Sequence, residues 1–107
     1  TCRFCCEVED LYLARLQKEN ETAPKFLLRT VEVSQTQPLV TFDGTRTDYR
    51  AFAKRQGVTL VPHLRFLGPD GEPLAPDLVG VASPDFYGAY LEGSISSAGE
   101  KLRRAGR

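Results

Sequence analysis

Apolar residues recur along the start of the chain at the spacing of a helix. Four apolar side chains stand three or four positions apart: Val8, Leu11, Tyr12 and Leu16. This spacing places them on one face of a helix. A polar stretch over residues 20–24 interrupts the pattern. We therefore expect a first helix that begins at residue 2 or 3 and ends at residue 17 or 18.

The next segment has the composition of a strand. Residues 26–33 read Phe-Leu-Leu-Arg-Thr-Val-Glu-Val, and their second half alternates between apolar and polar side chains. Such alternation is typical of a strand with one covered face. A loop is expected over residues 34–38. Residues 39–42 are too few to assign before the turn that Asp43-Gly44 predicts.

A second helix is expected from Thr45 to Gly57. Thr45 and Asp48 have the Thr-x-x-acid spacing of a helix cap. Gly57 supplies the stop, because glycine readily adopts the left-handed conformation that ends many helices. The buried face of this helix is expected to consist of Tyr49, Phe52 and Ala53.

The second half of the chain predicts a hairpin followed by a last helix. Residues 63–67 and 73–79 are strand segments, and the turn sequence Pro69-Asp70-Gly71 joins them. Two prolines within 73–79 indicate a strand at a sheet edge. Ser83-Pro84-Asp85 has the cap, the first-position proline and the first-turn acid of a helix start.

Phe86, Tyr90 and Leu91 are expected to face the core from this last helix. Residues 96–107 are small, polar and basic, so we expect a frayed tail there. No internal repeat or linker divides the chain. The predicted order is α-β-α-β-β-α, an α/β fold in a single domain over residues 1–107.

The composition is that of an ordinary globular domain, and it excludes some functions. The chain has 107 residues, of which 41% are hydrophobic and 26% charged, and its formal net charge is +0. The chain has no excess of positive charge that would attract polyanions. We therefore expect neither nucleic acid nor an anionic membrane surface as a partner. No apolar run is long enough to span a bilayer, so we expect no membrane insertion.

All three cysteines lie within the first six residues, Thr-Cys-Arg-Phe-Cys-Cys. Cys2 and Cys5 form a C-x-x-C at the expected helix start, where unpaired N–H groups and the helix dipole stabilise a thiolate. We therefore expect Cys2 to be the attacking thiolate and Cys5 the resolving thiol. Arg3 would lower the pKa of Cys2 further, and Phe4 would cover the pair and offer an apolar contact to a partner. A chance spacing, or half of a metal site, is the alternative.

Cys6 and His63 each allow two interpretations. Cys6 is either a small, partly buried helix residue or a spare thiol for an intermolecular disulfide or a metal. His63, the only histidine, is either a strand residue bonded locally or a base near Cys2. With Cys2 and Cys5 they would form a Cys₃His set of the kind that binds zinc. Three ligands from one helix start would be cramped, so we expect no metal site.

Several segments together resemble the thioredoxin superfamily. They are the C-x-x-C with Glu7-Val8 after it, Gly-Val-Thr-Leu-Val-Pro at 57–62, Phe-Leu-Gly-Pro-Asp-Gly at 66–71, and Leu78-Val79-Gly80 leading into Ser-Pro-Asp-Phe-Tyr at 83–87. The chain resembles in particular the small thioredoxin-like proteins of the bacterial cell envelope, a group that includes those tied to sulfur oxidation. The resemblance implies a thioredoxin-like three-layer α/β fold and a periplasmic location. A cytoplasmic location is the alternative, since a cytosolic thiol protein shows the same C-x-x-C.

The resemblance also implies a substrate site and an activity. Pro62 is expected to be cis and to lie against the dithiol, and the backbone of Val61 to pair with an extended substrate segment. Gly80 would let a partner approach closely. The implied activity is that of a thiol–disulfide oxidoreductase on protein or small-molecule disulfides. A redox partner protein would restore the dithiol, and no bound cofactor is expected.

Two features depart from the family pattern. The family sheet has a central strand directly before the C-x-x-C, where this chain starts, so that strand is either missing or replaced by another segment. The residues between the cysteines are Arg-Phe rather than Gly-Pro, and this pair tunes the redox potential, so the direction of the reaction stays open. A non-enzymatic thioredoxin-like binding module and a Cys/His metal-binding protein are the alternative functions.

Overall fold

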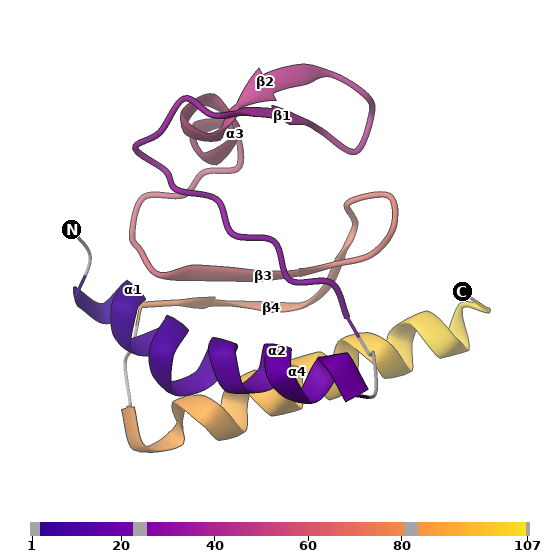
Figure 1. Cartoon of the computed structure of the whole chain (residues 1–107). Helices are drawn as coiled ribbons and strands as arrows, with labels where there is room; N and C mark the ends of the chain where they lie inside the picture. Colours follow the sequence, from indigo (N-terminus) through magenta and orange to yellow (C-terminus); the bar gives the residue numbers. More distant parts are fainter. Residues whose placement is uncertain (1–2, 23–25, 81–83, 107) are drawn as a thin grey trace.

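The computed structural model describes residues 3–22, 26–80 and 84–106, with the backbone alone at 3, 4, 22, 84 and 85. Figure 1 shows an antiparallel pair of strands in the middle of the molecule, with two long helical segments on one side. A small hairpin and a short helix lie on the other side of these strands. The fold class is α/β, as the sequence predicts.

The first helix runs without a break from Arg3 to Thr22. It consists of α1 (Arg3–Val8), a π-helical segment η1 (Glu9–Leu13) and α2 (Ala14–Thr22). It is longer than predicted, because the polar side chain of Asn20 has hydrogen-bond partners although Asn20 is helical. The Asn20 side chain donates to the Phe26 carbonyl at 2.8 Å and accepts from the Phe26 N–H at 3.2 Å. Asn20 thereby fixes the chain that follows the helix.

A hairpin occupies part of the segment predicted as the second helix. β1 (Pro38–Val40) pairs antiparallel with β2 (Arg46–Asp48), and Leu39 lies opposite Thr47. The helix α3 (Tyr49–Arg55) begins only after β2, with Asp48 as its N-cap accepting from the Ala51 N–H at 2.9 Å. The predicted start at Thr45 is therefore wrong. The predicted stop is confirmed, since Gly57 has a left-handed φ of 74°.

The second hairpin follows the prediction closely. β3 (His63–Leu67) pairs antiparallel with β4 (Pro73–Val79), and His63 lies opposite Val79. The turn between them has a left-handed Gly71, with a φ of 83°. Two irregularities interrupt the register, on either side of Phe66. Such bulges change which side chains lie opposite one another across the hairpin.

Residues 26–32 form no strand, so the strand predicted over 26–33 is wrong. A strand requires a neighbouring backbone to bond with its N–H and C=O groups. In the described part of the chain the sheets consist only of the β1–β2 pair and the β3–β4 pair. Nothing there takes the place of a central strand. The segment consequently stays irregular, and Leu27 is 91% exposed.

The last helix is longer than predicted and faces the core with other residues. α4 spans Pro84–Arg104, so the tail predicted to fray from residue 96 is helical over most of its length. Its buried residues are Tyr87, Leu91 and Ala98, whereas Phe86 and Tyr90 are 61% and 59% exposed. The prediction was thus correct for Leu91 and wrong for Phe86 and Tyr90. Ser83, the predicted cap, lies outside the described residues.

The core lies where α4 and the first helix meet the sheet. Val8, Tyr87 and Leu91 form its buried centre, at 2%, 3% and 1% exposure. The partly buried side chains around this centre are Tyr12, Leu13, Leu16, Leu64, Phe66, Leu78 and Ile95. The rings of Tyr12 and Tyr87 lie 5.1 Å apart at an angle of 49°. The first helix is thus attached to α4 mainly through aromatic and aliphatic contacts.

Replacing Tyr87 by Phe is expected to raise the free energy of unfolding by about 1 kcal/mol. The Tyr87 hydroxyl is buried without a hydrogen-bond partner among the described residues, and removing such a group relieves its desolvation cost. Burial, and to a lesser extent Tyr12, raises the pKa of Tyr87. Urea unfolding measures the effect, and Tyr90→Phe on the exposed face serves as the control with no expected change. A loss of stability in Tyr87→Phe would contradict this account of the core.

Candidate functional site

The described cysteines differ in chemical state. Cys5 lies in α1, is half-buried and is bonded in a disulfide. Cys6 is a free, exposed thiol. The structure therefore does not support the interpretation of Cys6 as a partly buried helix residue. Cys2 and the side chains of Arg3 and Phe4 lie outside the described residues. The pairing of Cys5 with Cys2 therefore stays a prediction.

The segment before β3 joins the end of β4 at one edge of the hairpin. The peptide bond Val61–Pro62 is cis, as predicted, whereas the position of Pro62 against the dithiol stays a prediction. Pro62 is buried and Val61 half-buried. The Gly80 N–H donates to the Pro62 carbonyl at 2.8 Å, and Gly80 has a left-handed φ of 69°. The structure therefore brings Pro62 and Gly80 together, as two of the predicted substrate residues.

Apolar side chains surround this pair on the surface. Leu60 is 56% exposed and Val79 is 46% exposed. A Cβ at Gly80 would lie 3.4 Å from a methyl group of Leu60. Figure 1 shows the start of α1, the loop before β3 and the end of β4 at the same end of the molecule. Leu60 was not among the predicted site residues, although its place directly before Val61-Pro62 could have indicated it.

His63 is held by a charged network on β4 and β3. Its side chain is only 10% exposed, and its Nε2 lies 2.7 Å from Asp77 Oδ2. Arg65 Nε donates to the same Asp77 oxygen at 3.0 Å, and Arg65 also donates to Gln56 at the end of α3. Asp77 and Arg65 were not predicted, because their contact depends on the irregular register around Phe66, which the sequence does not show.

This network orients the imidazole ring of His63. The Asp77 carboxylate can only accept, so Nε2 of His63 carries a hydrogen and donates it to Asp77. Nδ1 is buried and has no hydrogen-bond partner among the described residues. Leu64, the next residue, packs on the core, so His63 points to the opposite face of the strand. The structure thus favours the interpretation of His63 as a locally bonded strand residue.

The stability of the protein is expected to depend on Asp77 in acid. Burial acts to raise the pKa of Asp77, but the hydrogen bonds from His63 and Arg65 and their charges outweigh it, and the pKa lies below its ordinary value of 3.8. The unfolded chain therefore binds the proton more tightly than the folded chain. The contribution of Asp77 to stability is complete above pH 3.8 and is lost as the pH falls through the lower folded pKa.

Asp77→Asn is therefore expected to flatten the acid side of the stability profile. Urea midpoints measured from neutral pH down to about pH 2 test this. Asp43 serves as the comparison, since hydrogen bonds from Thr41 and Thr45 lower its pKa to about 2. Asp43→Asn should flatten the same region independently, because Asp43 lies in the β1–β2 turn. An unchanged profile in Asp77→Asn would contradict the network described above.

Among the described residues, no group of three or more His, Cys, Asp and Glu side chains is placed to hold a metal ion. None of the helices in the described ranges has the length and apolar character required to cross a membrane.

Comparison with known proteins places the chain in a family. Neither the curated proteins nor the solved structures gave a match. The family model of the thioredoxin-like domain matches residues 1–94, a range that includes the C-x-x-C, the Val61–Pro62 bond and Gly80. The matched range covers most of the 107 residues. The chain therefore belongs to the thioredoxin-like family.

Proposed function

We propose that this protein is a thiol–disulfide oxidoreductase that uses Cys2 and Cys5 as its reactive pair. The observation that carries the proposal is the position of the C-x-x-C, since the helix begins at Arg3 and Cys5 lies in its first turn. In a thioredoxin-like chain, this position exposes a thiol to the unpaired N–H groups of the helix start. The bonded state of Cys5 beside a free Cys6 also supports it.

The proposed reaction transfers two electrons from the dithiol to a substrate disulfide. The Cys2 thiolate attacks one sulfur of the substrate, forms a mixed disulfide and expels the other substrate sulfur as a thiolate, which takes up a proton. The Cys5 thiolate then attacks the Cys2 sulfur and releases the second substrate thiol. The pair ends as a Cys2–Cys5 disulfide, and a dithiol protein or small thiol reduces it again. This scheme requires no bound cofactor.

The proposed substrate surface is the apolar region beside Pro62. Its backbone groups come from Val61 and its flanking apolar side chains from Leu60 and Val79, both of which are exposed. Gly80 leaves space at the surface, because it has no side chain next to Leu60. An extended polypeptide with a disulfide fits this arrangement, since backbone pairing at Val61 would bind it without regard to sequence. Phe4 is proposed to add an apolar contact.

The proposed location is the bacterial periplasm, where thiol–disulfide exchange with folding or redox proteins takes place. The alternatives of a non-enzymatic binding module and of a metal-binding protein make different predictions. A binding module would leave the cysteines unreactive, and a metal-binding protein would carry stoichiometric zinc or copper(I) after purification under reducing conditions. The proposed natural partners are a disulfide substrate and a redox partner protein.

Insulin reduction by dithiothreitol tests the proposal. The protein is expected to accelerate the precipitation of the insulin B chain in catalytic amounts. Cys6→Ser is the matched control and should keep full activity, because Cys6 is the free thiol outside the proposed pair. A rate equal to that of dithiothreitol alone would refute the proposed function.

A further inference from the structure

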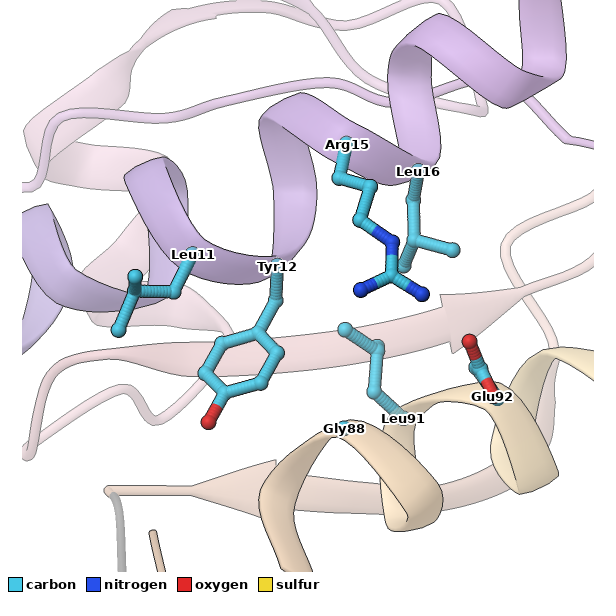
Figure 2. A pocket seen from close by; sticks show the side chains of 7 residues that line it. All are labelled: Leu11, Tyr12, Arg15, Leu16, Gly88, Leu91 and Glu92. Carbon is cyan, nitrogen blue, oxygen red and sulfur yellow. The ribbon is translucent and has the colours of Figure 1, made fainter. Parts of the chain in front are cut away.

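A groove separates the first helix from α4 along the surface of the molecule. Figure 2 shows its lining, which comes from η1 and α2 on one wall and from α4 on the other. Tyr12, Leu16 and Leu91 contribute its apolar surface. Gly88 keeps it open, because a Cβ there would lie only 3.1 Å from the Tyr12 ring. The groove therefore exists because Gly88 has no side chain where it faces Tyr12.

The size of the groove suits a side chain better than a free ligand. Its volume is about 220 Å³, below the range of roughly 300–1,000 Å³ that is typical of small-molecule pockets. At its edge lies Leu11, a leucine that is 61% exposed. The same surface thus carries both an apolar recess and an exposed apolar side chain.

The rim of the groove carries one charge of each sign. Arg15 stands on the α2 wall and Glu92 on the α4 wall. Among the described residues Arg15 has only a 3.4 Å contact to Glu19, through its Nε, with 73% of its side chain exposed. Glu92 has no hydrogen bond or ion pair within that part of the chain. Both charges are therefore available to a molecule that covers the groove.

We infer that this groove is the interface of a symmetric homodimer. An interface with two-fold symmetry must be complementary to itself, and this surface is: Leu11 of one protomer would enter the groove of the other, while its Arg15 would meet the other protomer's Glu92. By symmetry, each of these two contacts would occur twice in the dimer. A partner with a single excess charge would leave one of the two rim charges unpaired, so a second copy of this chain fits the surface best. This inference does not rest on the proposed redox function.

Sedimentation equilibrium of the full chain tests the inference. The Cys6→Ser protein is used throughout, because the exposed Cys6 could link two copies by a disulfide in another way. A reversible monomer–dimer equilibrium is expected between micromolar and millimolar protein. Leu11→Ser should raise the dissociation constant by about ten- to a hundredfold, since two buried leucines are lost at once. Circular dichroism confirms that each variant is folded.

Charge reversal distinguishes this interface from any other. Arg15→Glu alone and Glu92→Arg alone should each raise the dissociation constant by about three- to thirtyfold, because each creates two like-charge contacts. The double variant should return it close to the starting value. A protein that stays monomeric at millimolar concentration would overturn the inference and leave the groove to a side chain of a different protein. A dimer insensitive to Leu11 and to both charges would overturn it equally.

Discussion

Replacing Cys2 by Ser is expected to reduce disulfide exchange to the rate of the uncatalysed reaction. A serine hydroxyl is not ionised near neutral pH and cannot attack a disulfide sulfur, whereas a thiolate can. Because no mixed disulfide forms, the second step has no substrate either. Insulin reduction and exchange with oxidised glutathione both measure the loss. The effect should exceed that of any other single substitution on activity.

Cys5→Ser is expected to fail at a different point of the same reaction. Cys2 would still attack the substrate, but no second thiolate would resolve the mixed disulfide. The protein should therefore accumulate covalently bound substrate, which mass spectrometry detects as an added mass that dithiothreitol removes. Cys6→Ser should show neither the loss nor the trapped adduct. Full activity in Cys2→Ser, or a trapped adduct on Cys6, would show that the assigned roles are wrong.

Leu91→Ala is expected to have the largest effect on stability. Leu91 is 1% exposed and lies in the centre of the core with Val8 and Tyr87. Truncating such a leucine removes its transfer free energy and leaves a cavity, at a cost of about 2–5 kcal/mol. A domain of this size has a free energy of unfolding of about 5–15 kcal/mol. A substantial part of the stability should therefore depend on this one side chain.

The matched control is the same truncation at an exposed position. Leu27 is 91% exposed, and Leu27→Ala is expected to change the free energy of unfolding by no more than about 0.5 kcal/mol. Urea unfolding of both variants with the wild type measures the difference. Equal losses at the two positions would show that the buried centre is not where the structure places it.

The second hairpin could be predicted from the sequence because its signals are local. The turn at 69–71 contains both the proline and the glycine that such a turn requires. The end of α3 could be predicted for the same reason, because Gly57 lies just after the helix and has the left-handed conformation that ends many helices. The cis bond before Pro62 could be predicted only through the resemblance, since most bonds to proline are trans.

The first hairpin could not be predicted, because its pairing competes with a local signal. Thr45 and Asp48 are both acceptable helix caps, and no local rule chooses between them. Pairing of Arg46–Asp48 with Pro38–Val40 places Thr45 before a strand and leaves Asp48 as the cap. A strand of three residues gives no periodic signal of its own. The choice therefore depends on contacts that single-sequence patterns do not show.

The buried face of α4 is hard to predict, because its last turns have the small, polar and basic composition of a tail. Phe86 and Tyr90 form one stripe at helical spacing, and Tyr87, Leu91 and Ala98 form another. Only the second continues beyond residue 95, where Ala98 is buried and Leu102 half-buried. The basic residues near the end suit a helix C-terminus as well as a tail, and Glu100 pairs with Arg103 at 3.0 Å.

The candidate site was only partly predictable for a related reason. Pro62, Gly80 and the cysteines carry motifs, so the sequence indicated them. Asp77 and Arg65 carry none, and their contact with each other depends on a bulged register. The position of Leu60 beside Gly80 depends on the path of a loop. Residues that belong to no motif, and whose contacts depend on the fold, could therefore be identified only from the structure.

The reduction potential of the Cys2–Cys5 pair tests the central claim most directly. The Cys6→Ser protein is equilibrated with defined ratios of reduced and oxidised dithiothreitol or glutathione, and alkylation followed by mass spectrometry counts the free thiols. We predict a reversible two-electron transition between about −270 and −120 mV, the range of thioredoxin-like oxidoreductases. A potential below about −300 mV, typical of structural disulfides, or a Cys5 that never bonds to Cys2, would contradict it.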